Sequence, residues 1–97
     1  MAAVEEKISF SGKSDQEVFD AAKQAAPKAG LEVWKTREIA RLVLAKGIFE
    51  GEEVRCNIVV SMIDGSTTIS AESDELGDDV LAGVIQGMKE ALTAELG

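Results

Sequence analysis

Much of the chain alternates between apolar and polar residues, the pattern of β-strands that hold one face against a core. Residues 4–10 and 31–36 alternate, 39–49 form a long aliphatic run, the even positions of 54–62 are all apolar, and alternation resumes over 67–72. The pattern therefore predicts five strands.

The segment between the first two predicted strands has the period of a helix. Ser14 followed by Glu17 is a capping box, in which each side chain accepts a hydrogen bond from the other residue's backbone amide. Val18 and several alanines then form one apolar stripe. Pro27 indicates an irregular last turn and Gly30 a stop, so a helix is expected at about 14–28.

A second helix is expected at about 77–95. Its apolar stripe consists of Leu81, Val84, Ile85, Met88 and Leu92. Gly83, Gly87 and Ala91 lie four residues apart beside this stripe. Each interior glycine costs about 1 kcal/mol of helix stability against alanine. We therefore expect them to allow close packing, most simply against the alanine face of the first helix.

The predicted order of elements is β-α-β-β-β-β-α over a single domain of residues 1–97. Two helices must cover the strongly apolar face of one mostly antiparallel sheet. The fold class is therefore α+β, a two-layer sandwich with a five-stranded sheet and both helices on one face.

Two turn signals connect the later strands. Asp64-Gly65 is typical of a two-residue type I′ turn, which would pair Met62 with Thr67, Val60 with Ile69 and Ile58 with Ala71. A second turn is expected at Gly51, but the sequence leaves the register of that hairpin open.

Composition limits the function more than it defines it. With 18 acidic and 10 basic residues the formal net charge is −8, which argues against nucleic acid and anionic membranes as partners. The start of the chain lacks the pattern of a secretory signal. The single cysteine, Cys56, cannot form an internal disulfide and fits a reducing compartment. We expect a cytoplasmic protein.

Signatures of catalysis are not found in the sequence. There is no histidine and no tyrosine, which removes the usual general base and the commonest metal ligand. Cys56 shares the parity of Ile58 and Val60, so it is expected to be a buried, inert residue. Carboxylate pairs such as Asp78-Asp79 are interpreted as helix-dipole and solubility features. No enzyme activity, cofactor or metal is expected.

Apolar residues on the polar parity of the middle strands indicate a second, covered sheet face. Val59 and Ile63 point away from the predicted core side, and Trp34 joins them if Leu31 and Val33 point inward. A contiguous exposed apolar patch usually marks an interaction site. The sequence thus predicts a homodimer anchored by Trp34, Val59 and Ile63.

Basic residues are concentrated in the middle strands. Five of the ten lie in the second to fourth strands: Lys35, Arg37, Arg41, Lys46 and Arg55. They either bind an anionic ligand or partner, or protect strand edges from pairing. In the predicted dimer, Arg41 or Arg55 lies at the rim of the interface.

The stretch VFDAAKQAAPKAGLEV, leading into a four-strand meander and a closing helix, resembles small bacterial domains of unknown function with a TATA-binding-protein-like or helix-grip topology. The resemblance implies the same fold and, in some related folds, a ligand held between the sheet and the long helix. Two hypotheses result. The first is a non-enzymatic interaction module that self-associates through the outer sheet face. The alternative is a small carrier with an apolar ligand in a cavity lined by Phe10, Met62 and Met88.

Overall fold

The computed structural model describes residues 2–10, 12–64 and 66–97. Its elements are β1 (Ala2–Ile8), α1 (Asp15–Lys28), β2 (Glu32–Arg37), β3 (Leu42–Phe49), β4 (Glu52–Val60), β5 (Thr67–Ser73) and α2 (Asp78–Leu96). The predicted order and fold class are confirmed.

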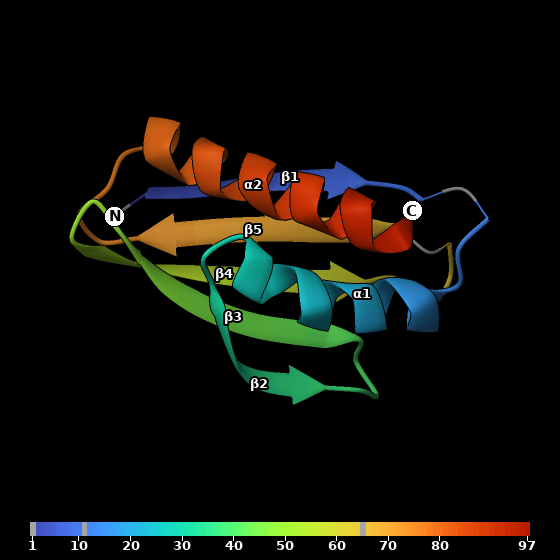
Figure 1. Cartoon of the computed structure of the whole chain (residues 1–97). Coiled ribbons are helices and arrows are strands. Elements are labelled where there is room, and N and C mark those ends of the chain that lie inside the picture. Colours follow the sequence, from blue (N-terminus) through green and yellow to red (C-terminus); the bar gives the residue numbers. More distant parts are fainter. Residues whose placement is uncertain (1, 11, 65) are drawn as a thin grey trace.

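The five strands form one antiparallel sheet in the order β1-β5-β4-β3-β2. Both helices lie on the same face of this sheet, with α2 over β1 and β5 and α1 beside it (Figure 1). Among residues 2–10, 12–64 and 66–97, no other element covers the opposite face. The architecture is therefore a two-layer sandwich, as predicted.

The core lies between the sheet and the helices. Val54, Cys56, Ile58 and Val60 of β4 are buried, so the predicted parity of this strand is correct. Phe19 and the alanines of α1 pack against them from above. The predicted stripe of α2 is buried throughout: Leu81, Val84, Ile85, Met88 and Leu92.

The first helix begins and ends as its sequence predicts. The Glu17 amide donates to Ser14 Oγ at 3.1 Å, and the Ser14 amide donates to Glu17 Oε1 at 3.4 Å, which completes the capping box. At the other end Gly30 has a positive φ of 82°. This conformation favours glycine and lets the chain leave the helix toward β2.

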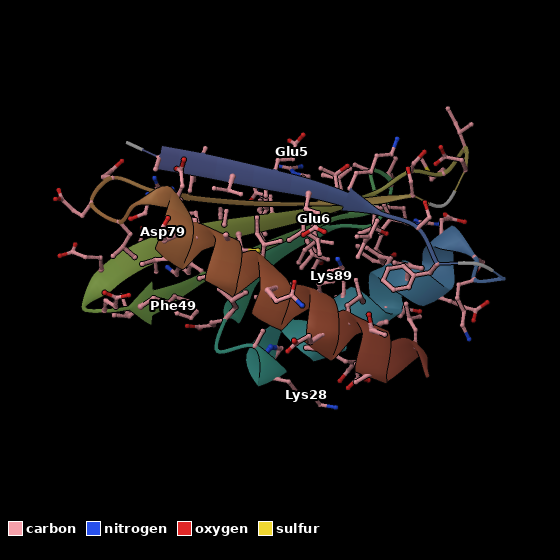
Figure 2. All side chains as sticks on the ribbon, turned by 90° about the horizontal axis from the view of Figure 1, so that it is seen from above. Glu5, Glu6, Lys28, Phe49, Asp79 and Lys89 are labelled. Carbon is pink, nitrogen blue, oxygen red and sulfur yellow. The ribbon has the colours of Figure 1, made fainter. Side chains whose placement is uncertain are left out.

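An ion pair holds the second helix to the edge of the sheet. Lys89 Nζ of α2 lies 2.7 Å from Glu6 Oε1 of β1, and Figure 2 shows the two side chains close together. Glu6 is on the helix side of β1, whereas its neighbours Glu5 and Lys7 point away from it. Edge strand β1 is therefore tied to the helix layer.

The type I′ turn occurs at the other predicted hairpin. Phe49 pairs with Glu52, and the two residues between them, Glu50 and Gly51, have φ of 51° and 80°. Positive φ at both central positions is the requirement for this turn. The register that the sequence left open is thus set by a two-residue loop.

The predicted register of the β4–β5 hairpin is wrong by two residues. Val60 pairs with Thr67 and Ile58 pairs with Ile69. The strands are joined by a longer loop, in which the Ser61 amide donates to the Ser66 carbonyl at 2.8 Å. Of the proposed Asp64-Gly65 turn, Gly65 lies outside the described residues. A shift of two keeps every side chain on its predicted face.

Candidate functional site

The uncovered side of the sheet is the candidate site, and we call it the outer face. The register aligns its outward side chains in rows across β2, β3, β4, β5 and β1. The first row is Arg37, Leu42, Val59, Thr68 and Lys7; the second is Lys35, Leu44, Asn57, Ser70 and Glu5; the third is Glu32, Lys46, Arg55, Glu72 and Ala3; Ile48 and Glu53 follow on β3 and β4.

An apolar patch lies on the neighbouring strands β3 and β4, in the first two rows of the outer face. Leu42 pairs directly with Val59, and Leu44 is the next outward residue along β3. Val59 is 43% exposed, and the two leucines are half-buried by their neighbours. These three residues, which we call the apolar patch, lack cover from any other described part of the chain.

Charge is distributed unevenly between the outer face and the rest of the surface. The rows hold five of the ten basic and four of the 18 acidic residues. The outer face therefore carries a formal net charge of +1, and the remainder of the chain carries −9. The outer face is thus nearly neutral, although the chain as a whole has a net charge of −8.

The predicted rim residue Arg55 lies on the outer face within a group of carboxylates. Its Nε donates to Glu72 Oε1 at 3.2 Å, and its terminal nitrogens lie 3.3 Å from Glu53 and 3.5 Å from Asp74. The hydrogen bond to Glu72 is the main cause that raises the pKa of Arg55. Arg55 is thus ion-paired within its own chain, close to the apolar patch.

The other predicted rim residue, Arg41, is not on the outer face. Its Nε donates to Asp15 Oδ2 at 2.9 Å, and its guanidinium carbon lies 5.8 Å from the centre of the Phe19 ring. Arg41 therefore ties the β2–β3 loop to α1 on the helix side. The sequence did not show this, because Arg41 adopts a positive φ of 50° that ends the strand alternation.

The predicted anchors are divided between two regions. Val59 lies in the apolar patch as predicted. Ile63 is 98% exposed but belongs to the β4–β5 loop rather than to a strand, so its placement on the outer face was wrong. Trp34 is 54% exposed, yet the β2–β3 register shifts by one residue there, so the tryptophan has no partner on β3.

Two loops at one end of the sheet carry large exposed apolar side chains. Ile39 in the β2–β3 loop is almost fully exposed, and Met62 and Ile63 project from the β4–β5 loop. Figure 1 shows both loops at the end where β1 leads into α1. Asp64 braces the second loop by accepting two hydrogen bonds from Ser66, which lower the pKa of the aspartate to about 2.

The predicted ligand cavity does not form as expected. Met88 is fully buried in the core, and Phe10 packs against the core from its edge. Met62 is 58% exposed in the loop, so it does not line an enclosed space. The register shift explains the error, because β4 ends at Val60.

The glycines of α2 do not make the predicted close contact. A Cβ placed at Gly83 or Gly87 would meet no atom within 4 Å among the described residues. Instead they line a shallow groove of about 200 Å³ together with Phe49, Val80 and Val84. Close packing occurs at Gly47, where a Cβ would lie 2.7 Å from the Gly30 carbonyl oxygen.

Reactive groups are sparse in the described ranges 2–10, 12–64 and 66–97. Cys56 is buried in the core, and burial raises the pKa of its thiol to about 12. In these ranges no cluster of three or more His, Cys, Asp or Glu residues is arranged to hold a metal ion. None of the helices described is both long and apolar enough to cross a membrane.

Comparison with known proteins identifies similar folds but no activity. No protein-family model and no curated protein matches the chain. A crystal structure of a DUF4468 family protein from Bacteroides ovatus aligns with 98% of this chain and 85% of that one, at 11% identity and a TM-score of 0.60. Ara h 8.0201 aligns with 99% and 95%, at 13% identity and a TM-score of 0.51.

A TBP-like protein from Parabacteroides distasonis aligns with 74% of this chain and 53% of that protein, at 15% identity and a TM-score of 0.48. At such identities these similarities define the fold alone. The predicted resemblance is confirmed at the level of the fold by the DUF4468 family protein and Ara h 8.0201, at TM-scores of 0.60 and 0.51.

Proposed function

We propose that this chain is a non-enzymatic interaction module that self-associates through the outer face. The observation that carries the proposal is the apolar patch of Leu42, Leu44 and Val59, set on the neighbouring strands β3 and β4 of a sheet face that has nearly balanced charge. An apolar centre surrounded by charged and polar side chains is the usual composition of a protein interface.

Electrostatics supports a second copy as the partner. Two molecules of net charge −8 repel each other, and the repulsion is strongest where the acidic surfaces face one another. Contact through the outer face brings together surfaces of formal charge +1 and turns both −9 surfaces away. Electrostatic repulsion between two copies is therefore weaker when they meet through the outer face than when their acidic surfaces meet.

The location that we propose is the cytoplasm. The single thiol is buried and has no disulfide partner in the chain. Such cysteine usage is common in reducing compartments.

Sedimentation velocity over a range of concentrations tests the proposal. The wild type should form dimers, and Val59→Lys should be monomeric, because a charge in the middle of the patch cannot be desolvated without a partner. Ala82→Lys, at an exposed position of α2, adds the same charge on the helix side and should leave the dimer intact. A wild type that stays monomeric at high concentration contradicts the proposal.

A further inference from the structure

We propose that two copies pack outer face to outer face about a two-fold axis parallel to β4, so that Val59 of one copy meets Val59 of the other. This inference rests on the proposed self-association. It adds which residues meet across the interface, and it follows from the strand register.

Rotation about an axis parallel to the strands keeps each row opposite the same row and reverses the order of the strands. With the axis over β4, the central strand of the sheet, β2 faces β1 and β3 faces β5. Such an interface is isologous, so each contact occurs twice except those on the axis. Aligned packing of two sheets, with strands within about 30° of parallel, is a common arrangement.

This arrangement pairs opposite charges. In the second row Lys35 of one copy faces Glu5 of the other, and in the third row Lys46 faces Glu72. Each pair occurs twice, which gives four attractive contacts. Val59 meets itself on the axis in the first row, so the apolar contact lies next to these charged rows, toward one end of the interface.

Three like-charge contacts accompany these pairs, because the one between Arg37 and Lys7 occurs twice. Arg37 faces Lys7 at a corner of the sheet, where both side chains reach solvent. Arg55 meets Arg55 on the axis, but each guanidinium is already held by Glu53 and Glu72 of its own chain. These like charges are therefore either solvated or already ion-paired within each copy, and Glu72 is shared between Arg55 of its own chain and Lys46 of the other.

Two other two-fold arrangements bring identical charges together. An axis perpendicular to the strands and centred on the second row places Lys35 on Lys35 and Glu5 on Glu5. An axis parallel to β3 places Lys46 on Lys46 and overlaps only three strands of each copy, because β2 is the edge. The axis over β4 is thus the one that uses the whole face.

The overlapping area is sufficient for a specific dimer. Five strands spaced about 4.8 Å apart and roughly 25 Å long give about 600 Å² per copy. The total of about 1,200 Å² is at the lower limit of stable interfaces. The dimer would present the acidic helices on both outer sides, and both pairs of exposed loops at the same end.

Cross-linking of single-cysteine variants tests the position of the axis. Opposed sheets lie about 10 Å apart, within reach of a short bismaleimide. Val59→Cys should cross-link more efficiently than Leu44→Cys, because the two Val59 thiols meet on the axis whereas the two Leu44 positions are offset sideways by two strand spacings, about 10 Å. Cys56 is buried and should not react, which wild type treated with the same reagent verifies. Efficient cross-linking of Leu44→Cys without that of Val59→Cys overturns the proposed axis.

A charge exchange tests the contact between Lys35 and Glu5. Lys35→Glu and Glu5→Lys should each weaken dimerisation about tenfold, because two attractive pairs become repulsive. The double variant should restore the wild-type dissociation constant to within about twofold. Additive losses in the double variant overturn the pairing.

These experiments separate the inference from the function on which it rests. A monomeric wild type defeats self-association itself. If the wild type is a dimer and Val59→Lys is a monomer, but Leu44→Cys cross-links and Val59→Cys does not, self-association through the outer face stands and only the proposed axis is refuted.

Discussion

Adjacent residues of β4 should respond in opposite ways to the same substitution. Ile58 is fully buried and pairs with Val43 and Ile69, whereas Val59 faces outward. Ile58→Lys forfeits about 3 kcal/mol of apolar burial, and an unpaired ammonium in the core costs several kcal/mol more. The sum is comparable to the whole stability of a domain of this size, about 5–15 kcal/mol.

Val59→Lys should lose less than about 1 kcal/mol of monomer stability, since the valine is already 43% exposed and the lysine can reach water. Circular dichroism with urea titration compares the two variants. Ile58→Lys should be unfolded or only marginally folded in buffer, and Val59→Lys should keep a native spectrum and midpoint at a concentration where the wild type is also monomeric. The opposite outcome, with Val59→Lys unfolded and Ile58→Lys native, would refute the assignment of the two sheet faces.

Three further predictions address other parts of the molecule. Gly47→Ala should lower the free energy of unfolding by about 1–3 kcal/mol in chemical denaturation, because its Cβ would collide with the Gly30 carbonyl. Gly83→Ala should raise the free energy of unfolding by up to about 1 kcal/mol, because the position is helical and open. Cys56 should be inert to a thiol reagent at pH 8 until the protein is unfolded. Folding raises the pKa of its thiol from 9.0 to about 12, so above pH 9 the thiol ionises in the unfolded chain but not in the folded one, and the stability of the protein should fall. The pKa of Asp64 is lowered from 3.8 to about 2, so its contribution to stability should be present above pH 4 and lost as pH falls toward 2, and Asp64→Ala should abolish that part of the acid dependence.

The alternation of apolar residues was sufficient to predict the fold. The side-chain period of a strand is two, so the even positions of 54–60 identify the core face of β4 whatever their partners are. The capping box at Ser14 and the stripe of α2 identify the helices in the same local way. One sheet face and two helix stripes then leave little choice but a two-layer sandwich.

Hairpin registers were less predictable, because they depend on backbone conformations that several turn sequences can adopt. Asp64-Gly65 has the preferred composition for a type I′ turn, yet that turn occurs at Glu50-Gly51. In the β4–β5 loop the Asp64 carboxylate accepts hydrogen bonds from Ser66. Met62 therefore leaves the core face.

The candidate site was predictable only where regular strand continues. Val59 keeps its predicted side because β4 is regular up to Val60. Trp34 and Arg41 depart from prediction at a register shift and at a positive φ, neither of which is visible in the polar pattern. Leu42 and Leu44 were part of an apolar run, and only the β3–β4 register showed that they face outward beside Val59.

The oligomeric state of the wild type tests the central claim most directly. Sedimentation equilibrium from micromolar to millimolar protein, in parallel with Val59→Lys and Ala82→Lys, measures it without labels. The account predicts a monomer–dimer equilibrium for the wild type and Ala82→Lys, and a monomer throughout for Val59→Lys. A wild type that remains monomeric over the whole range, or a Val59→Lys variant that dimerises as tightly as the wild type, would contradict it.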